Sequence, residues 1–327
     1  LRDDKEMILI DCGYPNFLAL IEDCASKNNI DLINGINYEK KAGGAPANVA
    51  VTISKLGNKA YFLGQIGNDS FGKFLLNTLE EYDINTDMVE VEGNTTLAFV
   101  SIDSNGERDF EFKRGSDGDY NFSKIDLSKI SNKDIIHFGS ATAFLEGRLK
   151  ETYFKLAEYA SQNSVFISFD PNYRDALITD SNINEYLSCV HKLIGYSNFV
   201  KLSEEELKLI TSEQDMNKGL DKIHSLGAKV VAVTLGDNGT LLSYRKRNII
   251  PSIKINQIDS TGAGDAFVGA VLSKVCELDD NKNIDNEVWE KIIRFANIVG
   301  AKTCENYGAI SSIPTLKELE STCLIEI

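Results

Sequence analysis

The glycine-rich segment Gly262-Ala263-Gly264-Asp265 combines residue types that can act on a phosphate and on an alcohol. The apolar run that follows predicts a buried helix from Ala266 onward. Free N–H groups and the positive dipole end at the start of such a helix form an anion site. A bound phosphate would repel the Asp265 carboxylate, which therefore makes sense facing a group that must lose a proton. The structural alternative is that Asp265 stabilises the helix N-terminus and the glycines form a loop.

A second glycine segment, Gly43-Gly44, exposes backbone to a ligand, and Asn48 follows one helical turn later. A carboxamide both donates and accepts hydrogen bonds, which suits a pair of sugar hydroxyls. The structural alternative is the start of a helix with Asn48 as its cap. Together the two segments favour a site for an anion and a polyhydroxyl compound.

Two further motifs resemble nucleotide-binding loops but lack an essential residue. The segment from Gly67 to Phe74 approaches a Walker A loop, yet Phe74 stands where the Mg-binding Ser or Thr must be. The stretch from Gly262 to Phe267 starts like a dinucleotide fingerprint, but bulky Phe267 occupies the third glycine position. These differences argue against a P-loop and against an NAD-dependent dehydrogenase.

Composition excludes other classes of protein. The chain has 327 residues, of which 43% are hydrophobic and 25% are charged, so it can bury a sizeable core. Its net charge of −15 repels nucleic acid and anionic membranes. No apolar run approaches the roughly 18 residues of a membrane span, and six scattered cysteines without a CxxC motif predict a reduced, cytoplasmic protein. We therefore expect a small-molecule substrate, no nucleic acid partner and no membrane partner.

The order of the segments predicts one doubly wound α/β domain over residues 1–327. Short apolar runs typical of buried parallel strands alternate with helical patterns. The predicted strands are Tyr61–Ile66, Ile135–Gly139, Val165–Phe169, Phe199–Leu202 and Val230–Leu235, and the predicted helices include Gly147–Gln162, Ser203–Ile210, Asn217–Leu226 and one after Pro314.

A smaller β subdomain is expected beside this sheet. Leu97–Ile102 and Arg108–Phe112 alternate apolar with polar residues around Asn105-Gly106, which is the pattern of a β-hairpin. A hairpin has little reason to join a parallel sheet. We expect it to combine with the irregular stretch Gly13–Lys41, so that the subdomain covers about 13–41 and 95–115.

The ordered motifs resemble those of the ribokinase-like carbohydrate kinase family. GGAPANVAVTISKLG from Gly43, with GQIGNDSFG from Gly64, is similar to the first family signature, and DSTGAGDAFVGAVL from Asp259 is similar to the second. The other matching motifs, in family order, are Asp170-Pro-Asn172-Tyr-Arg174, KLSEEE from Lys201, VTLGDNG from Val233, Phe295-Ala296-Asn297 and Gly308-Ala309-Ile310. The resemblance spans about Asp11–Pro314 and is greatest for the fructokinase branch, bacterial fructokinases in particular.

This resemblance implies phosphoryl transfer from ATP to a sugar. Asp265 would be the general base that takes the proton of the attacking hydroxyl, and Gly262, Ala263 and Gly264 would donate N–H groups to the transferring phosphoryl group. Glu206 would hold waters on Mg²⁺. The resemblance also implies a β lid over the sugar and a homodimer paired through the lids, and it leaves potassium dependence open.

The same resemblance divides the remaining candidates between the two substrates. ATP or its phosphates would contact Asn172, Thr234, Gly236, Gly239 and Asn297. The sugar would contact Asp11, Gly43, Gly44, Asn48, Arg114 and Arg174. For Arg174 the alternative role is a structural ion pair, and for Thr234 it is that of an ordinary β-branched strand residue. The segment ending in Asp11 lacks the family's usual glycine. His137 is expected to be a structural residue of its strand.

The implied reaction is phosphorylation of D-fructose to fructose 6-phosphate. Within the family the alternative is 2-keto-3-deoxygluconate kinase, whose acidic substrate needs a cationic group such as Arg174 or Arg114. A different class of protein would be a catalytically silent regulator that binds sugar and nucleotide. The intact loop from Gly262 to Asp265 argues against this regulator, because binding alone does not need a base.

Overall fold

The computed structural model describes residues 7–10, 16–21, 39–102 and 108–321 of the chain. Three features expected from the sequence lie outside these residues: Asp11, the Asn105-Gly106 turn, and residues 13–15 and 22–38 of the irregular stretch.

A large mixed sheet forms the centre of the molecule. Its described strands, in order across the sheet, are β13 (Arg247–Ile250), β12 (Thr240–Ser243), β11 (Val230–Thr234), β10 (Phe199–Ser203), β9 (Phe166–Asp170), β8 (Ile135–Gly139), β1 (Met7–Ile10), β4 (Ala60–Ile66) and β5 (Val89–Val91). Neighbours from β11 to β5 are parallel, and β12 and β13 extend one edge antiparallel. The predicted doubly wound, mostly parallel sheet is confirmed.

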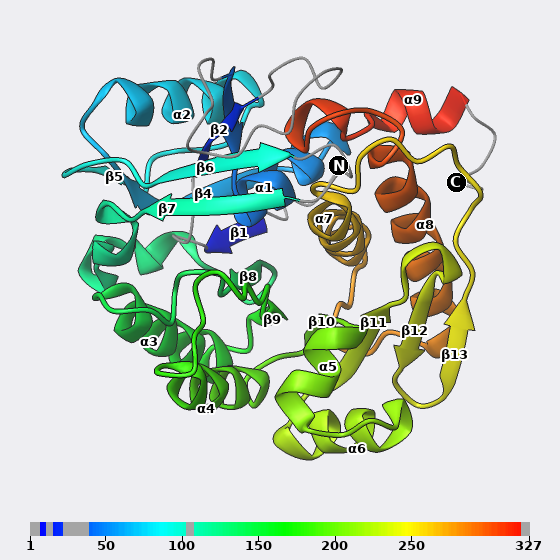
Figure 1. Ribbon diagram of the computed structural model, residues 1–327. Helices are drawn as coiled ribbons and strands as arrows, with labels where there is room; N and C mark the ends of the chain where they lie inside the picture. The colour runs from blue at the N-terminus through cyan, green and yellow to red at the C-terminus, as the bar shows by residue number, and fades with distance from the viewer. Residues whose placement is uncertain (1–6, 11–15, 22–38, 103–107, 322–327) are drawn as a thin grey trace.

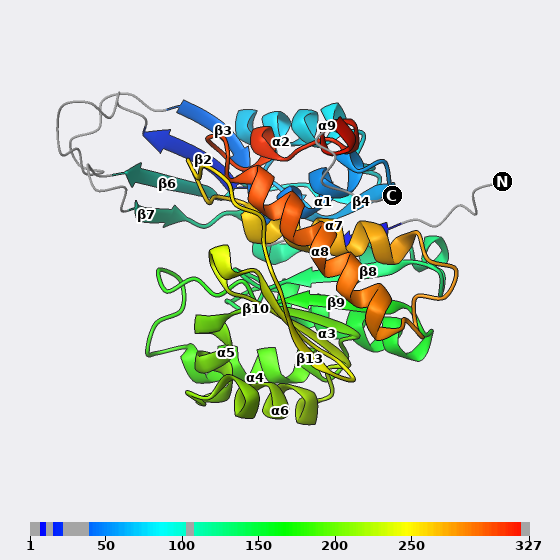
Figure 2. The same ribbon diagram turned by 90° about the vertical axis from the view of Figure 1, so that its right-hand side faces the viewer.

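Helices cover both faces of this sheet (Figures 1 and 2). One layer contains α1 (Ala45–Lys55), α2 (Ser70–Glu81), α7 (Ala263–Cys276), α8 (Asn286–Thr303) and α9 (Leu316–Ser321). The opposite layer contains α3 (Leu149–Gln162), α4 (Ile183–Ile194), α5 (Glu204–Thr211) and α6 (Met216–Leu226). The helices predicted with both ends have counterparts in α3, α5 and α6 whose ends differ by no more than two residues, and the helix predicted from Ala266 onward begins three residues earlier, at Ala263.

Alternation along the strands separates two hydrophobic cores. Phe62, Phe166 and Phe199 pack into the core under α1, α7 and α8. Their immediate neighbours in sequence, Leu63 and Val200 among them, pack into the core under α3 to α6. Successive strand residues point to opposite faces, so a strand that is buried on both faces reads as a continuous apolar run. This is why these strands were recognisable in the sequence.

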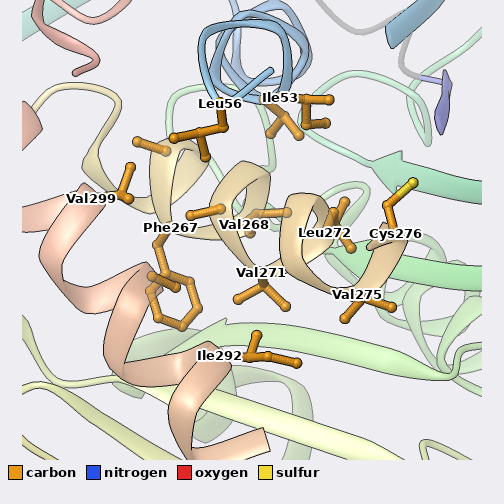
Figure 3. Packing of buried hydrophobic residues seen from close by; sticks show 14 of the residues in the cluster. Ile53, Leu56, Phe267, Val268, Val271, Leu272, Val275, Cys276, Ile292 and Val299 are labelled. Atoms are coloured by element: carbon orange, nitrogen blue, oxygen red, sulfur yellow. The ribbon is translucent and has the colours of Figure 1, made fainter. Parts of the chain in front are cut away.

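Helix α7 is buried nearly all round between α1, α8 and the sheet. Figure 3 shows Ile53 and Leu56 of α1 above it and Val271 directed toward Ile292 of α8. Gly269 permits the close approach of α1, because a Cβ atom there would lie only 2.5 Å from the Cβ of Thr52. The two helices are thus held at a fixed separation, which also fixes the polar residues at their N-termini relative to each other.

A second described sheet contains β3 (Glu39–Gly43), β2 (Asn16–Ile21), β6 (Leu97–Ile102) and β7 (Arg108–Lys113), and it projects from one side of the molecule (Figure 2). The predicted hairpin strands are present as β6 and β7, paired antiparallel from Leu97 with Lys113 to Ile102 with Arg108. Strand β2 runs parallel to β6 and antiparallel to β3.

The chain segment that enters β6 is held to the start of α2 by hydrogen bonds to Asp69. Asp69, the N-cap of α2, accepts from the N–H groups of Phe71, Gly72 and Thr95 and from the Thr95 hydroxyl. This arrangement accounts for the GNDSFG part of the first signature, which joins α2 to the base of β6 and is no phosphate loop.

In the described residues, no helix is long and apolar enough to span a bilayer.

Candidate active site

The predicted anion site lies at the first turn of α7. Gly262 caps this helix in the left-handed conformation, with φ of 78°, and a Cβ atom there would lie 2.7 Å from the Cβ of Ala309. The N–H of Ala263 donates to the Ser260 carbonyl at 3.2 Å. Within the described residues, the N–H groups of Gly262 and Gly264 have no protein acceptor. Two of the three predicted donors are therefore free for an anion, and the third has a partner.

Asp265 lies in this first turn and is held through both carboxylate oxygens. Asn48 of α1 donates its Nδ2 to Oδ2 at 2.8 Å, and Asn172, which follows β9, donates its Nδ2 to Oδ1 at 3.4 Å. The Oδ1 atoms of Asn48 and Asn172 are buried without a hydrogen-bond partner. The structure thus brings the two glycine segments together, and it leaves two acceptors beside the carboxylate for hydroxyl or water protons.

The environment of Asp265 suits a general base. Only 8% of the residue is exposed, and burial raises the pKa of its carboxyl to about 6, against the lowering effects of the Asn48 hydrogen bond and the Arg174 charge. A general base works best when its pKa lies near the operating pH. At neutral pH the Asp265 carboxylate is ionised and also basic enough to accept a proton.

Polar residues gather where neighbouring parallel strands end. Asp170 closes β9, and its Oδ1 accepts from the N–H of Asn172, which adopts a left-handed φ of 47°. The other oxygen, Oδ2, lies 3.1 Å from the ammonium of Lys201 on β10. Ligands of open α/β sheets bind beyond the carboxyl ends of the strands, so this edge is the expected place for the site.

Glu206 has a structural role besides its predicted contact with metal-bound water. Its carboxylate accepts from the N–H of Ser203 at 2.7 Å, which completes a capping box at the start of α5, and from the N–H of Tyr173 at 2.8 Å. Burial raises the pKa of Glu206, and nearby Lys201 opposes this change. The side chain joins the ends of β9 and β10, and its remaining lone pairs can still accept from water.

The predicted nucleotide contacts lie at the ends of β11 and β12 and on α8. Thr234 ends β11, and the Gly236 and Gly239 turn follows with positive φ angles of 59° and 92°. Asn297 of α8 accepts from the Thr240 hydroxyl and donates to the carbonyls of Ile250 and Pro251. Its carboxamide therefore holds the strand edge in place, and its contact with a nucleotide stays a prediction.

The two arginines expected near the sugar have different surroundings. Arg174 is exposed and acts on Asp265 through its charge. Arg114, at the base of β7, donates to the carbonyls of Glu146 and Thr142 and lies 3.6 Å from Asp117. Gly43 ends β3, and Gly44, with φ of 114°, caps α1. Arg114 therefore ties the second sheet to the loop after β8, and its contact with a sugar stays a prediction.

Three residues of the site were missed or given another role at the sequence level. Asp170 and Lys201 form an ion pair in which Asp170 is 2% and Lys201 8% exposed, and Asn172, expected at a phosphate, contacts Asp265. A lysine inside the apolar run FVKL was a readable signal, because a buried lysine needs a carboxylate partner. His137 is buried on β8 beside the Ser168 hydroxyl, and burial lowers its pKa to about 3, in keeping with the structural role expected.

A buried carboxylate beside free N–H groups at a helix N-terminus, placed at the carboxyl edge of a doubly wound sheet, provides an anion site next to a possible base, which is what phosphoryl transfer to an alcohol needs. The family model of the pfkB family carbohydrate kinases matches residues 19–316. The chain belongs to this family.

Relatives and solved structures agree with the family. The chain is 33% identical to fructokinase-1 of Oryza sativa subsp. japonica over 313 residues, covering 94% of this chain and 95% of the relative. It is 35% identical to the fructokinase of Vibrio alginolyticus over 283 residues, covering 86% of this chain and 91% of the relative. A crystal structure of Vibrio cholerae O395 fructokinase with fructose, ADP and calcium superimposes with a TM-score of 0.84, 28% identity, and coverage of 98% and 99%. A crystal structure of Xylella fastidiosa fructokinase with bound ATP superimposes with a TM-score of 0.84 at 28% identity, covering 97% of this chain and 98% of that one.

Proposed function

We propose that this carbohydrate kinase transfers the γ-phosphoryl group of ATP to D-fructose and forms fructose 6-phosphate. The observation that carries the proposal is the Asp265 carboxylate, held by Asn48 and Asn172 beside the free N–H groups of Gly262 and Gly264. The fructokinase relatives and the structure with fructose and ADP support the choice of sugar. This proposal keeps the roles that the sequence predicted for Asp265 and the glycines.

In the proposed mechanism Asp265 accepts the proton of the attacking hydroxyl as the oxygen bonds to the γ-phosphorus. The free N–H groups at the start of α7 stabilise the charge on the transferring phosphoryl oxygens, and such preorganised donors are a large part of catalysis in this reaction class. The orphaned Oδ1 atoms of Asn48 and Asn172 accept from sugar hydroxyls or ordered water, which orients the nucleophile. The second sheet, including Gly43 and β7, lies over the sugar as a lid and excludes water, and Gly44 follows it at the start of α1.

The residues present fit an indirectly held magnesium ion. Within the described part of the chain, no group of three or more His, Cys, Asp or Glu side chains is arranged to hold a metal directly. Buried Asp170, Glu206 and Asp265 outnumber the single buried Lys201, so the site favours a cation. Magnesium keeps several waters and reaches kinases on the nucleotide phosphates, where it neutralises charge. Glu206 would accept from those waters.

A panel of acceptors tests the proposed substrate. Purified protein is incubated with Mg-ATP and fructose, ribose, glucose, adenosine or 2-keto-3-deoxygluconate, and ADP release is followed by a coupled assay. We expect fructose to give the highest kcat/KM and ³¹P NMR to show a phosphate monoester at the 6-hydroxyl. Preference for the acid sugar would instead favour a carboxylate contact by exposed Arg174. Binding of sugar and ATP without ADP release would support a silent regulator.

The oligomer is also a proposal. We propose that two copies pair through the four-stranded second sheet, because its outer strands β3 and β7 are edges whose backbone groups can join another chain. Light scattering coupled to size exclusion should give the mass of a dimer, and a monomer mass at assay concentration would contradict this arrangement.

A further inference from the structure

Lys201 is a buried cation with unused hydrogen-bond donors. It lies on β10 with only 10% of its side chain exposed, and in the described residues its one ion-pair partner is Asp170, at 3.1 Å. An ammonium group has three N–H donors. Burial favours loss of its proton, but Asp170, Glu206 and Asp265 raise the pKa of Lys201 above its usual value. The group therefore stays charged and keeps donors to spare.

The ammonium of Lys201 lies against the first turn of α7. A Cβ atom built on Gly264 would be 3.2 Å from Nζ of Lys201, which is closer than most real Cβ contacts, and 3.7 Å from Cε, which is an ordinary contact distance. Gly264 is thus the residue that lets the lysine reach the anion site. The ammonium group of Lys201 on β10 therefore lies next to the turn that carries the free N–H of Gly264 and the proposed base Asp265.

The charge that develops at this turn exceeds what its free backbone donors can serve. The transferring phosphoryl group spreads its charge over three oxygens. Gly262 and Gly264 each offer a free N–H, while the N–H of Ala263 is shared with Ser260. A fixed ammonium beside these groups supplies a donor where one is missing, and charge-assisted hydrogen bonds are the stronger kind.

We propose that Lys201 is a catalytic residue that donates a hydrogen bond to an oxygen of the transferring phosphoryl group. This inference rests on the proposed function. The hydroxyl oxygen bonds to the γ-phosphorus, the bond from that phosphorus to the β–γ bridging oxygen breaks, and ADP leaves with that bonding electron pair. The hydroxyl proton goes to Asp265, and Lys201 keeps its own proton throughout. The competing explanation is that Lys201 only balances the three buried carboxylates.

The first test replaces Lys201 with methionine, which keeps length and removes charge. We expect Lys201→Met to lower kcat at least about 100-fold, the scale of losing one donor to the reacting group, while the Kd for ADP changes less than threefold. The matched control is Lys208→Met on the neighbouring helix α5, where a half-buried lysine outside the site pairs with Glu204. The control should keep kcat within twofold. A near-normal rate for Lys201→Met would overturn the proposal.

A double variant separates contact with phosphate from charge balance. Lys201→Met alone leaves Asp170 buried without its cation, which lowers the melting temperature. Adding Asp170→Asn removes that charge and keeps the acceptor for the N–H of Asn172. We expect the double variant to recover melting temperature but not kcat. Recovery of kcat to within threefold of wild type would show that charge balance was the only role.

The pH profile excludes an effect through Asp265 alone. Lys201 lowers the pKa of Asp265, so its loss shifts the acid limb upward. If this pKa shift were the whole effect of Lys201→Met, kcat would return to the wild-type value at pH 9. We expect the loss of kcat to persist there.

If fructose is not turned over, the proposed function fails separately, and the variants are compared on whichever sugar of the panel is phosphorylated. If none is, ADP with aluminium fluoride serves as the probe. Wild type should then bind it at least tenfold tighter than Lys201→Met, and equal affinities would refute the role.

Discussion

Replacing Asp265, the proposed base, with asparagine should greatly lower the activity of the protein and make it more stable. The pKa of Asp265 is raised from 3.8 to about 6 in the folded chain, chiefly by burial. A folded-state pKa above the unfolded one means that the unfolding free energy is highest below pH 3.8, falls as pH rises, and is lowest above pH 6. In wild type the ionised carboxylate therefore costs about 1.5 kcal/mol at pH 5 and about 3 kcal/mol at pH 8.

The carboxamide introduced by Asp265→Asn carries no charge to desolvate. It also finds hydrogen bonds, because rotation of the Asn48 or Asn172 carboxamide presents an Oδ1 that has no partner in wild type. We expect the unfolding free energy to exceed that of wild type by about 3 kcal/mol at pH 8, or about 4 °C in melting temperature for a chain of this length. The gain should shrink to about half at pH 5. Activity should fall by at least about 100-fold, the range of general-base loss.

Urea unfolding at pH 5, 6, 7 and 8, followed by circular dichroism, measures this difference, and a coupled ADP assay measures the rate. Asp69→Asn is the control of opposite sign. Burial opposes ionisation of Asp69, but hydrogen bonds from Thr95, Gly72 and Phe71 lower its pKa, so the variant should lose stability. The reasoning is refuted if Asp265→Asn is no more stable than wild type at pH 8, if its gain is the same at pH 5 and 8, or if its kcat is near normal.

Three further predictions concern the groups around the base. The acid limb of kcat/KM should fall tenfold per pH unit below about pH 6, and Arg174→Ala should move it upward, because Arg174 lowers the pKa of Asp265; an unmoved limb would exclude this coupling. Gly262→Ala should lower both stability and kcat, because the residue has φ of 78° and the added Cβ would lie 2.7 Å from Ala309. The control Gly57→Ala, at φ of 87° with no atom within 4 Å of the added Cβ, should cost only the backbone strain of about 1 kcal/mol and leave kcat unchanged. Equal effects of the two variants in melting and rate assays would show that the contact with Ala309 has no role. Arg114→Met should lower the melting temperature by leaving Asp117 buried without its cation, and addition of Asp117→Asn should restore it; no recovery would mean that Arg114 stabilises through its two carbonyl contacts alone.

The sequence by itself determined the layered architecture and pointed to Asp265 as the candidate base. Strands such as Phe166–Asp170 are buried on both faces, so their apolar runs are visible without coordinates. The loop before α7 was readable for a related reason, since its glycines and the acid at the helix start are adjacent in sequence. Both features depend on neighbours in sequence.

Only the tertiary structure decided which distant side chains surround Asp265. The contact with Asn48 spans 217 residues, and it exists because Gly269 lets α1 and α7 pack closely. Lys201 and Asp170 meet because β9 and β10 are parallel neighbours that end at one edge of the sheet. Glu206, Asn172 and Arg114 likewise gained structural partners that no local pattern records, apart from the capping box of Glu206. Local periodicity reports which face is buried, whereas charge balance and pKa depend on groups that the fold brings together from separate elements.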